Sequence, residues 1–133
     1  MQMESCHFIN GDLELTSEQD LQPLVDALVQ GGMDCLTLHQ EGGLWHGRLE
    51  LFAGEGNYSE PRQLVAHLLA ILAELPEPVL PLWHGCLRKE MDLGYQSGTA
   101  PILQNRLPAA QLLGLAEQGL DLVVTLYPGE VQA

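Results

Sequence analysis

Residues 33–53, MDCLTLHQEGGLWHGRLELFA, contain two strand-like segments that meet at a pair of glycines. The segments 33–41 and 44–53 join at Glu41-Gly42-Gly43, and a short glycine-containing connection of this kind is typical of a β-hairpin. The second segment alternates charged and apolar residues, so one face of that strand is expected to be buried and the other wet. The sequence therefore predicts an antiparallel hairpin over 33–53.

The segments on either side of this hairpin predict further helices and strands. Apolar residues recur at helical spacing between capping, proline and glycine residues over 21–30, 60–75 and 107–118. Strands are expected over 6–15, 79–93 and 120–127, with a bulge at Gly85 in the second of them. The last strand, LDLVVTLY, is nearly all apolar, which favours a central place in the sheet.

The resulting order is β-α-β-β-α-β-α-β. This order predicts an α+β fold in which helices cover one face of a mostly antiparallel sheet, close to a ferredoxin-like unit extended by one αβ pair. A length of 133 residues fits one domain, 1–133.

The composition indicates a globular protein of a reducing compartment. Hydrophobic residues make up 46% of the chain, which argues against disorder, and no apolar run approaches the roughly 20 residues of a membrane helix. The start, MQMESCHFINGD, lacks the features of a secretory signal. Three scattered cysteines, Cys6, Cys35 and Cys86, make no disulfide framework. We therefore expect a cytoplasmic protein.

The charge of the chain is strongly negative and unevenly distributed. The net charge is −13, from 18 acidic and 5 basic side chains, which excludes a general nucleic-acid binder. No Lys or Arg precedes Arg48, whereas eight acids do: Glu4, Asp12, Glu14, Glu18, Asp20, Asp26, Asp34 and Glu41. Such a one-sign segment attracts a cationic partner, although acidity also serves solubility alone.

Five of these acids are our candidate partner-binding residues. Asp12 and Glu14 are expected on an outward strand face, and Glu18, Asp20 and Asp26 on the adjoining helix. One contiguous acidic patch would result. We predict that this patch docks a basic protein, with no cofactor.

The tetrapeptide LWHG occurs twice, at 44–47 and 82–85. The structural interpretation is a strand packed under a helix in both places. The alternative is a small-molecule or metal site, or an enzyme, whose pocket is lined by Trp45, His46, Trp83 and His84. For a metal, His46, His84 and Cys86 are the candidate ligands, but the chain has none of the usual metal-ligand spacings.

Catalysis is not indicated by the sequence. The serines lie outside any GxSxG motif, and two of them, Ser17 and Ser59, are explained as helix caps. No catalytic residue is therefore assigned, and a binding protein is favoured over an enzyme.

The stretches HFINGDLELTSEQDLQPLVDAL, LVAHLLAILAEL and LPAAQLLGLAEQGLDLVVTLYP resemble a family of small bacterial α+β domains of unknown function. In size, acidity and build the chain is also similar to bacterial toxin-immunity proteins, which implies a cognate toxin as the basic partner. A third possibility is an assembly or regulatory subunit that forms a homodimer through an unpaired sheet edge.

Overall fold

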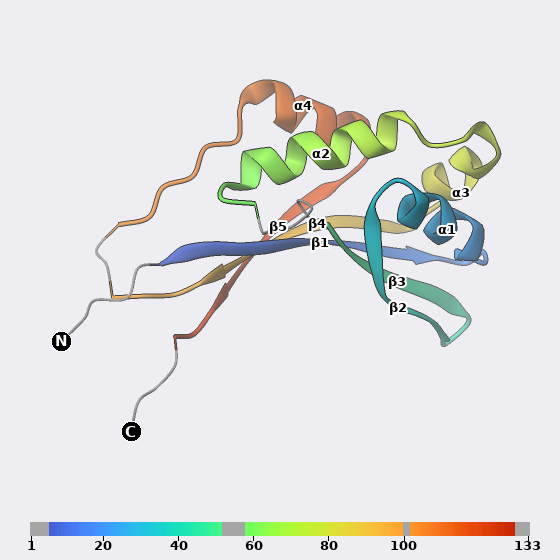
Figure 1. Ribbon diagram of the computed structural model, residues 1–133. Helices are drawn as coiled ribbons and strands as arrows, with labels where there is room; N and C mark the ends of the chain where they lie inside the picture. Colours follow the sequence, from blue (N-terminus) through green and yellow to red (C-terminus); the bar gives the residue numbers. More distant parts are fainter. Residues whose placement is uncertain (1–5, 52–57, 100–101, 130–133) are drawn as a thin grey trace.

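The computed structural model describes residues 6–51, 58–99 and 102–129. Helices lie on one side of a five-stranded sheet (Figure 1). The elements are β1 (His7–Ser17), α1 (Gln22–Gln30), β2 (Met33–Glu41), β3 (Leu44–Leu51), α2 (Pro61–Ala73), the 3-10 helix η1 (Glu77–Val79), α3 (Leu80–His84), β4 (Arg88–Gln96), α4 (Ala109–Glu117) and β5 (Asp121–Tyr127).

The sheet is mixed, with the strand order β2-β3-β1-β4-β5. β1 pairs antiparallel with both β3 and β4, and β2 pairs antiparallel with β3. β5 instead runs parallel to β4, because the helix α4 carries the chain back across the sheet before β5 begins. The α+β class is confirmed, whereas the expected mostly antiparallel sheet is corrected to a mixed one.

The hairpin over 33–53 is confirmed for its described part. Gly42 and Gly43 form the two-residue connection, with φ of 61° and 80°. Positive φ at both positions is the geometry of the turn that matches the twist of paired strands, and glycine adopts it without steric cost. Residues 52 and 53, at the end of the expected second strand, lie outside the described residues.

The core lies between the sheet and the helices. Alternate residues of the strands point toward the helices and are buried, as the side-chain period of two requires. α2 supplies the largest helical share of the core, because apolar residues recur along one of its faces. The central buried side chains are Leu13, Leu15, Leu49, Leu64, Val65, Leu68, Met91 and Leu93.

The strand expected over 79–93 is wrong in its first half. Residues 77–84 form η1 and α3, and the strand β4 starts only at Arg88. Pro78 and Pro81 each lie in the first turn of their helix, where a missing N–H is tolerated. Gly85 makes no bulge: it ends α3, with its N–H donating to the Pro81 carbonyl at 2.9 Å.

The expected central place of 120–127 is also wrong. β5 is an edge strand that pairs with β4 alone. Leu122, Val124 and Leu126, which face the helix side, are 39%, 64% and 62% exposed. A nearly continuous apolar run is typical of a buried strand, but here the run ends the sheet and carries its apolar side chains into solvent.

No single helix among the described residues is long and apolar enough to cross a membrane. α2 and the segment Glu77–His84 reach that length and composition only as a pair, with a bend of 101° between them.

The packing of α2 leads to a stability prediction. Leu68→Ala should lower the free energy of unfolding by about 2–5 kcal/mol, because Leu68 is fully buried and its loss leaves a cavity. Leu113→Ala on α4, where the side chain is 59% exposed, is the matched control and should cost less than about 1 kcal/mol. Urea denaturation of both variants measures the difference, and equal losses would contradict this description of the core.

Candidate functional site

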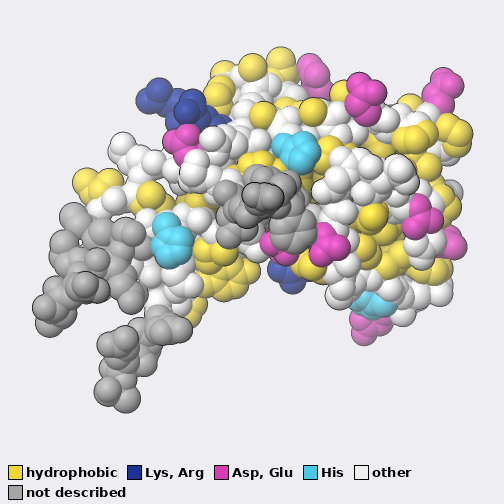
Figure 2. All heavy atoms as spheres, in the orientation of Figure 1, with side chains coloured by type: hydrophobic (Ala, Val, Ile, Leu, Met, Phe, Trp, Pro, Cys, Tyr) yellow, Lys and Arg dark blue, Asp and Glu magenta, His cyan; other side chains and the backbone are white. Residues whose placement is uncertain are grey.

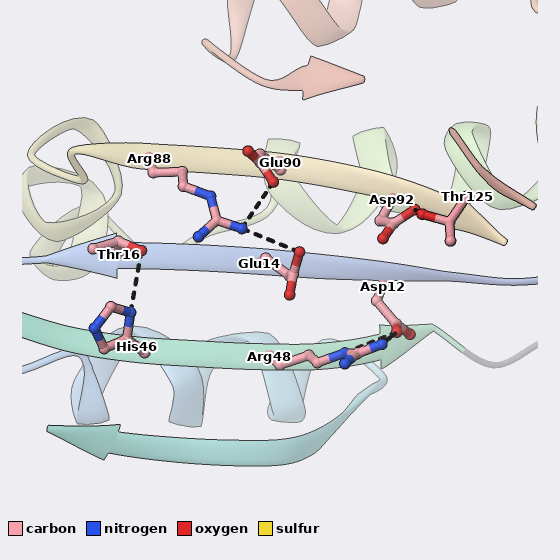
Figure 3. Close-up of polar contacts among 9 residues, drawn as sticks. All are labelled: Asp12, Glu14, Thr16, His46, Arg48, Arg88, Glu90, Asp92 and Thr125. Carbon is pink, nitrogen blue, oxygen red and sulfur yellow. Dashed lines mark hydrogen bonds and ion pairs between the residues drawn. The ribbon is translucent and has the colours of Figure 1, made fainter. Parts of the chain in front are cut away.

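The candidate site is the open face of the sheet, on the side away from the helices (Figure 3). Along β1 the buried Leu13 and Leu15 alternate with Asp12, Glu14 and Thr16, which therefore point to this open face. Residues paired across neighbouring strands project to the same face. The polar residues of β3 and β4 that pair with those of β1 therefore join them on the open face, and so do the residues of β2 that pair with these residues of β3.

Four carboxylates lie in register across four neighbouring strands. Asp34 of β2 pairs with Glu50 of β3. Glu50 pairs with Asp12 of β1, and Asp12 pairs with Asp92 of β4. We call Asp34, Glu50, Asp12 and Asp92 the acidic row. Like charges directly opposite each other in a sheet are destabilising, by roughly 0.2–1 kcal/mol a pair.

One arginine partly neutralises the acidic row at its most buried member. Asp12 is 5% exposed, and its Oδ2 accepts hydrogen bonds from Arg48 Nε at 2.9 Å and Nη2 at 2.6 Å. The hydrogen bond to Asp12 raises the pKa of Arg48 above its ordinary value. The other oxygen, Oδ1, is buried and has no hydrogen-bond partner among the described residues. Arg48 thus leaves part of the Asp12 carboxylate unsatisfied.

For the other members of the row, the hydrogen bonds found among the described residues come from neutral side chains. Glu50 accepts a hydrogen bond from Asn10 Nδ2 at 3.4 Å, and Asp92 accepts one from Thr125 Oγ1 at 2.7 Å. Asp34 is exposed at the β2 edge of the row. Neutral donors orient these carboxylates without cancelling their charge.

The neighbouring cross-strand row of the open face, which contains Glu14, has a more even balance of acidic and basic side chains. Glu14 lies opposite Arg48 on one side and opposite Glu90 on the other. Arg88 Nη2 bridges the two acids, at 3.2 Å from Glu14 and 2.9 Å from Glu90. The hydrogen bond from Arg88 lowers the pKa of Glu90 below its ordinary value. The two arginines of the open face thus hold Asp12, Glu14 and Glu90, and no arginine or lysine is paired with the remainder of the acidic row among the described residues.

Two histidines complete the open face beside Arg88. The rings of His39 and His46 stack with centroids 5.3 Å apart, and His46 Nδ1 lies 3.4 Å from Thr16 Oγ1. His39 Nε2 is 3.8 Å from a carboxylate oxygen of Glu41. A cavity of about 290 Å³ adjoins them, lined also by Arg48 and Arg88.

The structure brings together only two of the five predicted partner-binding acids. Asp12 and Glu14 lie on the open face, where each is paired with an arginine. Glu18 lies in the connection after β1. Asp20 accepts the N–H of Gln22 at the start of α1, and Asp26 accepts from the Gln22 side chain.

The predicted single patch is therefore divided between the open face and the α1 side of the molecule. The acidic side chains in Figure 2 are likewise spread over the visible face. Sequence reasoning missed Glu50, Glu90 and Asp92, because they follow Arg48 in the sequence and come to β1 only through strand pairing. The alternation of charged and apolar residues in 48–51 was a signal that pointed to Glu50. Glu4 lies outside the described residues.

The two LWHG copies adopt different structures. The first lies in β3 and the second in α3 and its terminating glycine. Trp83 is 0% exposed, its Nε1 donates to Gln118 Oε1 at 3.0 Å, and Lys89 Nζ is 4.7 Å from its ring centroid. Trp45 is partly buried against the core. The expectation of a strand under a helix in both places is thus corrected for the second copy.

The side chains of the alternative site, which would combine both LWHG copies, do not line one shared cavity. The cavity beside His46 is lined by neither Trp45, Trp83 nor His84. His46, His84 and Cys86 belong to no group of three or more possible metal ligands among the described residues. Burial raises the pKa of the Cys86 thiol, which donates to the Leu82 carbonyl and is therefore a poor nucleophile.

The charge of the acidic row leads to a prediction about stability. Glu50→Gln should raise the free energy of unfolding by roughly 0.2–1 kcal/mol at low salt, because it removes a like charge between Asp34 and Asp12 while a side-chain oxygen remains for Asn10. Salt screening should reduce this gain. Urea denaturation in low and high NaCl measures both effects. A variant that is less stable at every salt concentration would show that the row is not strained.

The Arg88–Glu90 pair leads to a prediction about pH. A carboxyl whose folded pKa is lowered stabilises the fold above its unfolded pKa of about 4.3, and this contribution is lost as pH falls through the folded pKa. Glu90→Gln should therefore be less stable than wild type by about 0.2–1 kcal/mol at pH 7, with the difference vanishing toward pH 3. Glu117→Gln, on exposed α4, is the control and should differ little at either pH. A Glu90→Gln difference that persists at pH 3 would contradict the assignment.

Comparisons of the chain with protein-family models, with curated proteins and with solved structures find no match. The resemblance to small bacterial domains and to immunity proteins therefore stays a prediction.

Proposed function

We propose that this chain is a non-catalytic protein-binding domain that docks a basic protein surface on the open face of its sheet. The observation that carries the proposal is the acidic row, in which Asp34, Glu50, Asp12 and Asp92 lie in register on adjacent strands. A partner that places arginine or lysine side chains over the row replaces repulsion between like charges with attraction. The binding face proposed here keeps Asp12 and Glu14 from the sequence prediction and adds Asp34, Glu50 and Asp92.

The geometry of the open face favours fast and selective association. The sheet holds the backbone of all four acids, so little conformational entropy is lost when a partner binds. The net charge of −13 extends the same field around the molecule and steers a cationic partner toward it. Charged contacts of this kind mainly set the rate of association and the choice of partner, and apolar anchors supply affinity.

The finer proposal is that the basic partner is a cognate bacterial toxin, which the domain neutralises in the cytoplasm. Its support is the similarity of type to immunity proteins and the acidity of the chain. An encoded basic toxin beside this open reading frame would favour it over a general binding role. The acidic row does not by itself distinguish a toxin from another basic protein.

We also propose that the first four strands with α1 and α2 form a ferredoxin-like unit, to which α4 and β5 add one αβ pair. The support is the order β2-β3-β1-β4 with antiparallel neighbours throughout. In this arrangement the open face of the sheet is the side that the helices leave uncovered, as a docking surface requires.

A matched pair of variants tests the docking face. Asp34→Asn with Asp92→Asn removes two charges from the acidic row, and Glu74→Gln with Glu117→Gln removes two exposed charges from the helix side. Each double variant has the same net charge. Binding of a fluorescent octa-arginine peptide at low salt should weaken roughly 2- to 30-fold for the first and little for the second, as expected for two ion pairs of about 0.2–1 kcal/mol.

The same variants then serve as bait in a bacterial lysate. A basic protein retained by wild type and by the helix-side variant, but lost with the acidic-row variant, supports the proposal. Equal weakening of peptide binding in both double variants would show that net charge alone acts, and would overturn the assignment to the open face.

A further inference from the structure

The outer edge of β5 is an open strand edge without the usual protection. β5 has β4 on one side and no strand on the other among the described residues. Natural proteins protect such edges with charged residues, prolines or bulges, because unpaired N–H and C=O groups pair readily with another strand. Residues 122–127 of β5 contain no charge and no proline, and the pairing of β5 has no bulge.

The opposite edge of the sheet is protected. β2 has a bulge between Cys35 and Thr37, and it carries Asp34, His39 and Glu41. A bulge and charges are two of the devices that discourage edge pairing. The contrast between the two edges of one sheet singles out β5 as the edge that is open to a second strand.

The side chains of β5 are exposed as well as its edge. Leu122, Val124 and Leu126 project to the helix side and are 39%, 64% and 62% exposed. A cavity of about 460 Å³ adjoins Val124 and Leu126 and is also lined by Tyr95 and Leu103. The helix-side face of β5, which borders the open edge, is therefore apolar at all three of these positions.

Charge identifies a second copy of this chain as the occupant. A basic partner would find only one counter-charge on β5, Asp121 at its first position, because residues 122–129 are uncharged. Two copies, each with a net charge of −13, repel each other over most of their surface, and the uncharged segment 122–129 is a place where they can approach. A two-fold contact further requires that the patch be complementary to itself.

β5 meets that requirement when two copies pair antiparallel about Val124. Leu122 of one copy then faces Leu126 of the other, and the two Val124 residues face each other. Asp121 faces Tyr127 and not a second carboxylate. This register buries apolar against apolar at each helix-side position and brings no like charges into direct opposition.

We propose that the protein forms a symmetric homodimer by antiparallel pairing of β5 with β5, which joins two five-stranded sheets into one. The proposal depends on the edge of the sheet and not on the acidic row, so it stands or falls separately from the proposed partner-binding function. The joined sheet has the open faces of both copies on one side.

Sedimentation velocity over a concentration series tests the dimer. Wild type should be a dimer once its concentration reaches roughly 0.1 mM. Val124→Lys should sediment as a monomer at the same concentration, with an unchanged circular dichroism spectrum. Val29→Lys is the matched control, because Val29 is a 43% exposed valine on α1, and it should stay dimeric. A monomeric wild type at roughly 0.1 mM, or a dimeric Val124→Lys variant, would overturn the proposal.

Cysteine cross-linking tests the register. Paired residues in a sheet have the Cα separation that a disulfide needs, so Val124→Cys should form a 124–124 disulfide on mild oxidation, and Val123→Cys should not link to itself. Mass spectrometry of the cross-linked peptide separates this bond from any made by Cys6, Cys35 or Cys86. Absence of the 124–124 bond in a dimer, or a 123–123 bond in its place, would overturn the pairing about Val124.

Discussion

The phase of β1 between β3 and β4 is the constraint on which both the core and the candidate site depend. Because side chains alternate across a strand, turning Leu13 and Leu15 toward the helices turns Asp12, Glu14 and Thr16 to the open face. A slip of one residue would expose both leucines and bury the acids. The burial of apolar side chains under α2 therefore holds the carboxylates of β1 in line with those of β3 and β4. The Arg48–Asp12 ion pair joins β3 to β1 on the open face and favours the same register.

Local sequence signals predicted most of the elements but not their neighbours in the sheet. Gly42 and Gly43 specify the hairpin and α2 follows from apolar spacing, so both were predicted correctly. Residues 79–87 form a short, mostly apolar run with one proline, Pro81, and such a run has no periodicity that separates a strand from a turn of helix. β5 was misplaced for a related reason: composition measures how apolar a strand is, but not how many strands lie beside it.

The acidic row shows why the site could be predicted only in part. A run of acids without a base was visible in the sequence and drew attention to Asp12 and Glu14. The same run included Asp20 and Asp26, which the chain uses at the first turns of α1. Glu50 and Asp92 are 38 and 80 residues beyond Asp12 in the sequence, and only strand register places them beside it. Charge along a sequence is thus a poor guide to charge across a sheet.

The two exposed surfaces of the sheet have opposite chemistry, and this difference lets them act together. The open face is rich in carboxylates and attracts cations, whereas β5 is uncharged after Asp121 and mostly apolar. A basic protein gains little electrostatic attraction at β5, and an acidic second copy is repelled from the acidic row. Joining two copies through β5 places two acidic rows on one continuous sheet face. When a basic partner spans both rows, its second contact is intramolecular and therefore strengthens overall binding. The edge strand thus raises the avidity of the open face without touching the partner.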